Sequence, residues 1–215
     1  MGDRYRLVGR LYDVASLERV LYRQQRARLL ELLGPQPGAT VLDVGCGTGL
    51  NFDGLQRLVG PRGCVLGIDA GASMLAAARR RVCRAGWPNI HLVQGDLTDL
   101  AGVLHIAGVD PDTVAAVVAT FVLSLLPDDA SVWAAVDGLA STHTVRVAVS
   151  DLGPPDNAPA LLRPVLRALT ALGGGDPARR PWDRLLARAP AAVHEVHLGG
   201  HVHLAVGDLR ATGEM

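Results

Sequence analysis

Hydrophobic and polar positions along the chain follow two patterns, one with helical spacing and one typical of buried strands. Residues 16–33 carry leucines at helical spacing behind Ser16, a suitable N-cap, and Gly34-Pro35 should end that helix. A further helix is expected over residues 71–85. Apolar runs typical of strands buried on both faces occupy residues 40–45, 64–69, 89–96, 113–123 and 144–152. This order predicts an α/β fold with a doubly wound, mostly parallel sheet.

The end of the chain has a different pattern. Residues 191–198 and 201–206 flank Gly199-Gly200, which predicts a hairpin and so one antiparallel strand in the sheet. With a two-residue turn, His194, His201 and His203 share one face and His197 points away. Histidines two apart on a strand can bind zinc, but no carboxylate joins them on that face. We therefore favour structural or substrate-pocket histidines and predict no metal.

The pattern predicts a single domain over residues 1–215. The Gly- and Pro-rich stretches at 153–159 and 173–181 do not separate two cores. Residues 34–215 should form the Rossmann-like core. Residues 1–33, the N-terminal arm and its helix, are expected to act as a lid over a bound ligand.

Composition narrows the class of protein. The chain has 215 residues, 49% of them hydrophobic, with no run near the ~20 apolar residues of a membrane span and no apolar signal-peptide core. We expect a soluble cytoplasmic protein. The formal net charge is zero, which argues against a nucleic-acid partner. All 21 basic residues are arginine, which excludes lysine-based catalysis. Three scattered cysteines do not suggest disulfides.

Three glycines stand at alternating positions where the first strand should turn into a helix. Gly45, Gly47 and Gly49 form G-x-G-x-G, one place tighter than the G-x-G-x-x-G of dinucleotide-binding folds. Such a turn brings backbone N–H groups and the positive end of a helix dipole against a ligand. Cys46 lies within this loop, where we interpret it as a small loop residue and not as a nucleophile.

Three aspartates follow three successive predicted strands, at the sheet edge where doubly wound folds bind ligands. Asp43 precedes the glycines, where a carboxylate suits a cationic ligand. Asp69 ends the second strand, where its carboxylate can accept hydrogen bonds from both hydroxyls of a ribose. Asp96 follows the third strand, where it can accept a hydrogen bond from an adenine amino group. Each aspartate also fits a helix-capping or loop role.

The segments "VLDVGCGTG", "VLGIDAGASMLAAAR" and "NIHLVQGDL", in this order and spacing, resemble the class I S-adenosylmethionine-dependent methyltransferases. The resemblance covers roughly residues 39–130. It implies a seven-stranded sheet, and the terminal hairpin is similar to the family's reversed last strand. "GTGLNF" and "RAGWPNIHLV" are similar to bacterial members near the quinone and phospholipid-headgroup methyltransferases.

The resemblance also implies roles for individual residues of a cofactor site. The glycine loop with Cys46 would border the methionine part, Asp43 would meet its ammonium, and Asp69 would hold the ribose. Remaining contacts would come from Ala70 and Met74 on adenine, Asp96 and the Leu97 N–H on the adenine edge, Thr120 and Phe121 beside the methyl group, and Tyr12 closing over the cofactor.

The predicted function is methyl transfer from S-adenosylmethionine, leaving S-adenosylhomocysteine, to a small, partly apolar acceptor that is quinone-, lipid- or natural-product-like. The Asn/Asp-Pro-Pro-aromatic motif of enzymes that methylate planar amines is replaced by "ATFV" at 119–122, which argues against nucleobase or glutamine substrates. No catalytic residue is identified; Asp151, His203 and Tyr12 are candidates.

Trp182, Leu185 and Leu186 are expected to wall an apolar acceptor pocket. Late arginines either accommodate an anionic headgroup or lie on solvated helix faces; they are residues 163, 167, 179, 180, 184 and 188. Transient contact with a membrane surface is expected if the acceptor is a lipid or quinone, and the oligomeric state stays open.

Two alternative functions remain. One is a catalytically idle S-adenosylmethionine-binding module that acts through a partner. The other is a nicotinamide-dependent oxidoreductase, which is disfavoured because a Tyr-x-x-x-Lys pair cannot exist in a chain without lysine.

Overall fold

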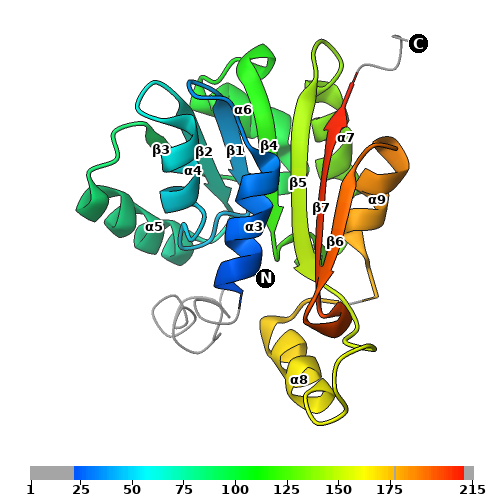
Figure 1. The fold of residues 1–215 in the computed structure, drawn as a ribbon. Coiled ribbons are helices and arrows are strands. Elements are labelled where there is room, and N and C mark those ends of the chain that lie inside the picture. Colours follow the sequence, from blue (N-terminus) through cyan, green and yellow to red (C-terminus); the bar gives the residue numbers. More distant parts are fainter. Residues whose placement is uncertain (1–21, 177, 211–215) are drawn as a thin grey trace.

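The computed structural model describes residues 22–176 and 178–210, whose strands form a seven-stranded sheet (Figure 1). The strand order is β3-β2-β1-β4-β5-β7-β6. Pairs from β3 to β5 are parallel, while β7 is antiparallel to both β5 and β6. The strands are β1 (Thr40–Val44), β2 (Cys64–Asp69), β3 (Ile90–Gln94), β4 (Val114–Thr120), β5 (Val145–Leu152), β6 (Val193–His197) and β7 (Val202–Leu209). The predicted mostly parallel sheet with one reversed strand is confirmed.

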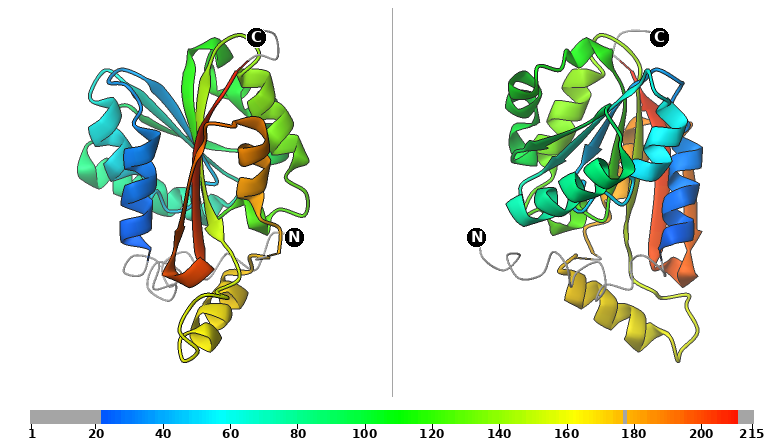
Figure 2. Two further views of the ribbon diagram at one scale, coloured as in Figure 1. Left: turned by 45° about the vertical axis from the view of Figure 1, so that its right-hand side comes forward. Right: turned by 90° about the vertical axis from the view of Figure 1, so that its left-hand side faces the viewer.

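Helices cover both faces of the sheet, as Figures 1 and 2 show. One face is covered by α3 (Arg23–Leu33), α4 (Phe52–Val59) and α5 (Ala72–Ala85), and the other by α6 (Leu100–Ala107), α7 (Ala130–Leu139) and α9 (Pro181–Arg188). The helix α8 (Arg163–Gly173) lies beyond the end of β5, away from the other helices (Figure 1). Short 3₁₀ turns complete the fold: η1 (Leu97–Asp99), η2 (Pro111–Thr113), η3 (Leu123–Leu125) and η4 (Leu198–Gly200).

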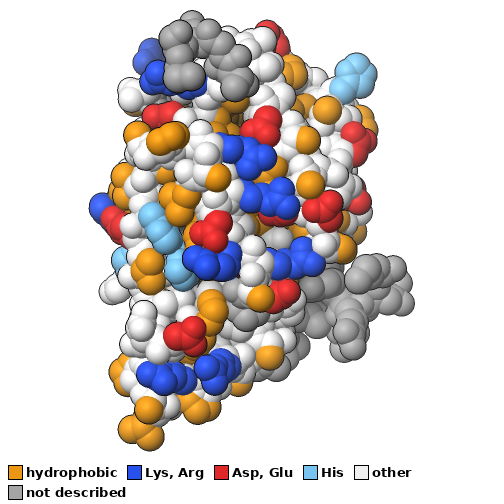
Figure 3. All heavy atoms as spheres, turned by 90° about the vertical axis from the view of Figure 1, so that its right-hand side faces the viewer, with side chains coloured by type: hydrophobic (Ala, Val, Ile, Leu, Met, Phe, Trp, Pro, Cys, Tyr) orange, Lys and Arg blue, Asp and Glu red, His pale blue; other side chains and the backbone are white. Residues whose placement is uncertain are grey.

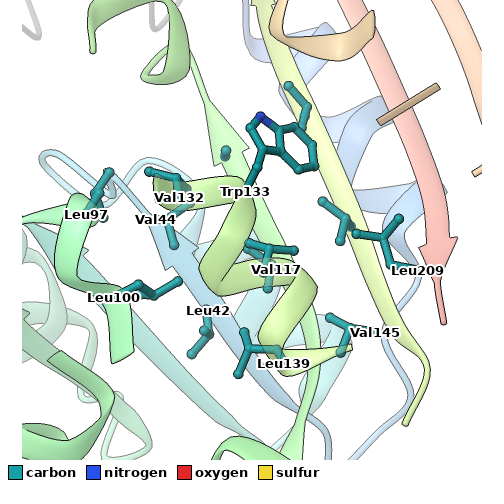
Figure 4. Packing of buried hydrophobic residues seen from close by; sticks show 14 of the residues in the cluster. Leu42, Val44, Leu97, Leu100, Val117, Val132, Trp133, Leu139, Val145 and Leu209 are labelled. Carbon is teal, nitrogen blue, oxygen red and sulfur yellow. The ribbon is translucent and has the colours of Figure 1, made fainter. Parts of the chain in front are cut away.

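The inner strands β1, β2, β4, β5 and β7 send alternate side chains into two separate hydrophobic clusters. Leu42 and Val44 point from β1 toward α6 and α7, where Trp133 packs (Figure 4). Val41, the residue before Leu42, packs instead beneath α3 and α4 with Leu29. Burial on both faces explains why these strands are almost wholly apolar.

The helix α3 is part of this packing. Leu29, Leu30 and Leu33 are 0–5% exposed beneath it. Arg146 of β5 donates from Nε and Nη2 to the last two carbonyls of α3, at 2.9 and 3.0 Å. Residues 23–33, expected to belong to a lid, are therefore a covering helix of the sheet. Ser16 and the arm lie outside the described residues, so lid closure by the arm stays a prediction.

The hairpin between β6 and β7 has the predicted pairing but not the predicted turn. Val196 pairs with His203, as expected. Residues 198–200 form the 3₁₀ turn η4 instead of a two-residue connection, with φ of 51° at Leu198 and 97° at Gly200. His201 consequently leaves the strand alternation and turns to the α3 face, where it meets Tyr22. The prediction that it shares a face with His194 and His203 is wrong.

Among the described residues, no helix combines the length and the apolar character needed to cross a bilayer.

The turn itself supplies a stability test. A Cβ on Gly199, whose φ is 65°, would collide with the backbone of Ala158. Gly199→Ala should therefore lower the free energy of unfolding through this collision as well as through the strain of a left-handed alanine. Gly86 has a similar φ of 68° with open space beside it, so Gly86→Ala should cost only about 1–2 kcal/mol of left-handed strain. Urea unfolding measures both variants. Equal losses would contradict the close packing of η4 on Ala158.

Candidate functional site

The candidate site lies at the carboxyl ends of β1, β2 and β4. The chain leaves β1 toward β2 on one side, whereas β4 lies on the other, so the strand order reverses beside β1. Such switch points open a crevice in which doubly wound folds bind ligands. The loop from Gly45 to Asn51 crosses this edge and leads into α4.

The three glycines of the loop serve different purposes. All have positive φ, 67° at Gly45, 55° at Gly47 and 80° at Gly49. A Cβ on Gly45 would strike Val122 and one on Gly49 would strike Phe52, so the protein's own side chains exclude a larger residue at both positions. At Gly47 nothing lies within 4 Å of the Cβ position. Of the three, Gly47 is therefore the one that faces open space.

Asp69 fixes the shape of this loop. Its Oδ2 accepts from the Gly47 N–H at 2.8 Å, and its Oδ1 accepts from the Gly71 N–H at 2.7 Å. Burial raises the pKa of Asp69, and these two hydrogen bonds oppose the shift. Each carboxylate oxygen keeps a second lone pair, so Asp69 can still accept hydroxyl groups from a ligand.

Asp43 is fully buried and only half satisfied. Its Oδ1 accepts from Nδ2 of Asn51 at 2.8 Å, while Oδ2 has no hydrogen-bond partner. Burial raises the pKa of Asp43 to about 7, against the opposing effects of Asn51 and Arg26. An unpaired buried carboxylate oxygen is costly and is therefore a candidate contact for a cationic ligand group.

A polar network next to Asp43 joins three elements. Nη1 of Arg26 on α3 donates to Oδ1 of Asn51 at 2.7 Å and to Oγ1 of Thr120 at 2.8 Å. Nδ2 of Asn51 also donates to Thr120, at 3.2 Å. Thr120 belongs to the site predicted from the sequence, whereas Arg26 and Asn51 are missing from that prediction. The signal for Arg26 was available, because it lies on the same helical stripe as Tyr22, Leu29 and Leu33.

Aromatic side chains continue this network beyond the end of β4. Phe121 has a φ of 55°, rare for a bulky residue. The Arg26 guanidinium lies 5.6 Å from the centre of its ring, and the Tyr22 ring lies 5.1 Å from it. The Tyr22 hydroxyl in turn lies 2.7 Å from Nε2 of His201, in a buried contact.

The residues predicted near an adenine lie at the ends of β2 and β3. Met74 and Leu97 are buried, whereas Ala70 and Asp96 are exposed. Asp96 caps the turn η1 by accepting from the N–H and hydroxyl of Thr98 at 2.9 and 2.8 Å, which lowers its pKa. Only its Oδ1 makes these bonds, so the capping role leaves Oδ2 able to accept from a ligand.

Cys46 packs in the cluster beneath α3 and α4 and is 7% exposed. Burial raises the pKa of its thiol, so it is neither a thiolate nor a nucleophile. Tyr12 lies outside the described residues, and its closing role stays a prediction.

Asp151, a catalytic candidate from the sequence, anchors the turn that follows β4. It is 1% exposed, and its oxygens accept from the N–H and hydroxyl of Ser124 at 2.9 and 2.6 Å and from the Leu152 N–H at 2.8 Å. Burial raises its pKa against these hydrogen bonds. Through these hydrogen bonds Asp151 holds the turn that follows Phe121 and Val122.

His203, the other catalytic candidate in the described chain, lies beneath α9. Its ring stacks on Trp182 at 3.9 Å between centroids, Nε2 contacts the Gly200 carbonyl at 3.0 Å, and Nδ1 contacts His194 at 3.1 Å. Burial lowers the pKa of His203 to about 4. The ring is thus neutral at pH 7 and held by packing.

Trp182 and Leu185 are fully buried in the core on the α9 face, so the expectation that they wall an acceptor pocket is wrong. Basic and acidic side chains are interspersed on this side of the molecule (Figure 3). Five of the six late arginines pair with aspartates: Arg167–Asp156, Arg179–Asp176, Arg180–Asp183, Arg184–Asp129 and Arg188–Asp137, at 3.0–3.7 Å. The sixth, Arg163, donates from Nε to the Ala158 carbonyl at 2.8 Å. These pairs favour the solvated-face interpretation.

Comparison with known proteins identifies the family to which the residues of this site belong. Residues 41–142 match the methyltransferase domain family. Together with the acidic strand ends and glycine loop, the match settles the predicted resemblance. These residues form a class I S-adenosylmethionine-dependent methyltransferase domain. The domain covers the glycine loop, the three aspartates and the end of β4.

Similar sequences include two bacterial methyltransferases. The chain is 38% identical over 96 residues to nocamycin O-methyltransferase from Saccharothrix syringae, covering 45% of this chain and 33% of that one. It is 36% identical over 91 residues to demethylmenaquinone methyltransferase from Staphylococcus aureus (strain JH9), covering 42% and 36%. The match thus spans about a third of the length of these relatives.

Solved structures share the fold of the methyltransferase domain. A SAM-dependent methyltransferase from Aquifex aeolicus has a TM-score of 0.58 at 18% identity, covering 86% of this chain and 89% of that one. Geranyl diphosphate C-methyltransferase from Streptomyces coelicolor A3(2) has a TM-score of 0.61 at 15% identity, covering 89% and 77%.

The described residues contain no group of three or more His, Cys, Asp or Glu side chains suited to hold a metal ion.

The raised pKa of Asp43 predicts a pH-dependent stability. Between pH 4 and 7 the folded ligand-free protein binds a proton at Asp43 that the unfolded chain lacks, so this group's contribution to stability falls as pH rises, by about 1.4 kcal/mol for each pH unit within that range. Asp43→Asn removes this dependence. The unfolding free energy of the variant minus that of the native protein should therefore rise as the pH increases from 5 to 7.5, as measured by urea unfolding.

His203 contributes in the opposite direction, because its lowered pKa makes stability rise with pH between about 4 and 6.5. That contribution is shared by native protein and Asp43→Asn, so it cancels in their difference. A difference that stays constant with pH would contradict a buried, protonated Asp43.

Proposed function

We propose that this protein binds S-adenosylmethionine at the β1–β4 switch point and transfers its methyl group to a small, partly apolar acceptor. The observation that carries the proposal is the pairing of an unsatisfied buried Asp43 oxygen with the Arg26 guanidinium across Asn51. A carboxylate and a guanidinium side by side complement the ammonium and carboxylate of an amino-acid ligand. Opposite charges at that spacing are what the methionine end of the cofactor would require.

The other residues of the edge fit the rest of this cofactor. Gly47 leaves open space beside the loop, and Asp69 keeps lone pairs for the ribose hydroxyls. Asp96 and the Leu97 N–H are the proposed contacts of the adenine edge, with Ala70 and Met74 against its faces. Thr120 and Phe121 at the end of β4 lie next to Arg26, so the methyl group would sit near them.

When bound, S-adenosylmethionine supplies a methyl group already activated by its sulfonium. The protein's task is then to orient the acceptor in line with that group and to exclude water. Asp43 and Arg26 fix one end of the cofactor, and Asp69 fixes the middle. Asp151 holds the loop that carries Val122, and thereby one wall of the acceptor side.

The described part of that wall favours an acceptor with apolar surface. Phe121 and Val122 are half-buried at the end of β4, and Tyr22 packs against Phe121. Two relatives are named nocamycin O-methyltransferase and demethylmenaquinone methyltransferase, which agrees with a natural-product-like or quinone-like acceptor. A lipid acceptor would share the apolar surface of such molecules. Zero net charge argues against nucleic acid, and we expect a cytoplasmic protein that contacts membranes transiently if the acceptor is a lipid or quinone.

An assay with labelled S-adenosylmethionine and cell extract distinguishes the proposed methyl transfer from the alternative, a catalytically idle cofactor-binding module. Transfer of the label to an extractable small molecule supports the proposal, whereas binding without transfer supports the module.

Asp69→Ala tests the ribose contact. Loss of a charge-assisted hydrogen bond should weaken S-adenosylhomocysteine binding by about 1.5–3 kcal/mol, measured by calorimetry. Because Asp69 also holds Gly47, thermal unfolding must show that the variant is folded. Unchanged affinity would remove Asp69 from the site, and tighter binding of NAD than of S-adenosylhomocysteine by the native protein would overturn the proposed cofactor.

Arg26→Gln tests the methionine end. The variant should bind S-adenosylhomocysteine about 10- to 100-fold more weakly, because a charged contact to the carboxylate is lost. 5′-Methylthioadenosine, which lacks the amino-acid end, is the matched ligand, and its affinity should change little. Equal losses for both ligands would show that Arg26 shapes the pocket without contacting the carboxylate.

A further inference from the structure

We infer that Tyr22 and His201 form a proton relay on the acceptor side of the site, and that the methyl acceptor bears a hydroxyl group, as a phenol or hydroquinone does. This inference rests on the proposed methyl transfer and adds the class of acceptor and the residues that take its proton.

The pair has the geometry of a relay. The Tyr22 hydroxyl oxygen lies 2.7 Å from Nε2 of His201, and the two side chains are 5% and 0% exposed. The other ring nitrogen of His201, Nδ1, is buried and makes no hydrogen bond of ordinary geometry, although contact with the Gly153 backbone partly offsets the effect of burial on the ring's pKa. A buried histidine kept only for packing normally has well-formed hydrogen bonds at both nitrogens, whereas here the one well-formed bond is the contact with Tyr22. Burial lowers the pKa of His201, which keeps the ring neutral and able to accept a proton.

The protein maintains this contact against local strain. His201 reaches the α3 face because η4 replaces a regular two-residue turn, with Leu198 at a φ of 51°. A regular hairpin would have pointed His201 to the opposite face, beside His203. An unusual turn that delivers a buried histidine to a tyrosine fits a functional site.

The pair lies beside residues that are proposed to hold the cofactor. The Tyr22 ring packs on Phe121, which follows Thr120, and Thr120 accepts from the same Arg26 that is proposed to hold the cofactor. Arg26 and Tyr22 are one helical turn apart at the start of α3, and both contact the Phe121 ring. Tyr22 therefore borders the acceptor side of the proposed methyl position, and Arg26 brings a positive charge near any oxyanion formed there.

A hydroxyl group is a weak nucleophile until its proton leaves, so its methylation gains from a base. In the relay, the acceptor's proton passes to the Tyr22 oxygen as the proton of Tyr22 passes to Nε2 of His201. The acceptor oxygen's electron pair forms the new bond to the methyl carbon, and the electrons of the broken carbon–sulfur bond return to sulfur. His201 ends as an imidazolium and releases its proton after the methylated product leaves.

The first test needs no substrate. In full-length protein labelled with ¹⁵N-histidine, nuclear magnetic resonance should show His201 as the neutral tautomer with the proton on Nδ1 and Nε2 accepting from Tyr22. His201→Asn assigns the signals by their loss, and Tyr22→Phe should shift the Nε2 resonance. A proton on Nε2 would overturn the inference, because that nitrogen could not accept from Tyr22.

The second test follows labelled methyl transfer to phenol, 4-chlorophenol, 4-nitrophenol and 1,4-naphthohydroquinone, with aniline as the non-hydroxyl probe. The native protein should methylate hydroxyl probes. Tyr22→Phe and His201→Asn should each lower kcat by about 100-fold or more, with the largest losses on the least acidic phenol. His194→Asn, an exposed histidine on the same hairpin, is the matched control and should retain full activity.

Transfer to aniline alone, or no transfer to any hydroxyl probe, would overturn the relay. So would equal losses on all phenols in both variants, which would indicate a packing role. Calorimetry with S-adenosylhomocysteine separates the two proposals. If the native protein does not bind this ligand, the proposed function fails. If the native protein and the variants bind it equally well and one of the outcomes above is observed, only the relay is overturned.

Discussion

The burial of the Asp43 carboxylate at the strand-order switch is the constraint on which the site depends. A carboxylate removed from water must be neutralised or paired, and here a single hydrogen bond from Asn51 satisfies only one oxygen. Burial raises the pKa of Asp43 to about 7, so the charged and neutral forms are close in free energy at neutral pH. The fold responds by bringing Arg26 from α3 to Asn51, so that the first described helix is tied to the end of β4 through Thr120.

That arrangement changes the meaning of α3. The helix covers the sheet with Leu29, Leu30 and Leu33, and its first turn presents Arg26 and Tyr22 to the carboxyl edge. Its position is fixed at the other end by Arg146, which binds its last carbonyls. A helix so firmly docked can place polar groups with accuracy, as a site built on regular elements requires.

The glycine loop shows that one sequence motif can combine unrelated causes. Gly45 and Gly49 are small because Val122 and Phe52 occupy the space beside them, whereas Gly47 is small where the loop meets open space. Asp69 holds the Gly47 N–H, so the second strand's carboxylate sets the loop that the first strand begins. The loop is thereby preorganised before any ligand binds, which lowers the ordering cost of binding.

The sequence alone determined the strands, their parallel order, the reversed last strand and the aspartates at the strand ends. Those features follow from local periodicity and from the rule that parallel strands end at one edge. Tertiary structure decided what periodicity cannot encode. Arg26 and Asn51 contact Thr120, from which they are separated by 94 and 69 positions in the sequence. Tyr22 contacts His201, which lies 179 positions later. Trp182 became core because α9 docks on β5 and β7, and His201 changed face because left-handed residues in η4 broke the two-residue alternation. Contacts between distant segments depend on how helices dock and turns bend, and a linear pattern carries no record of either.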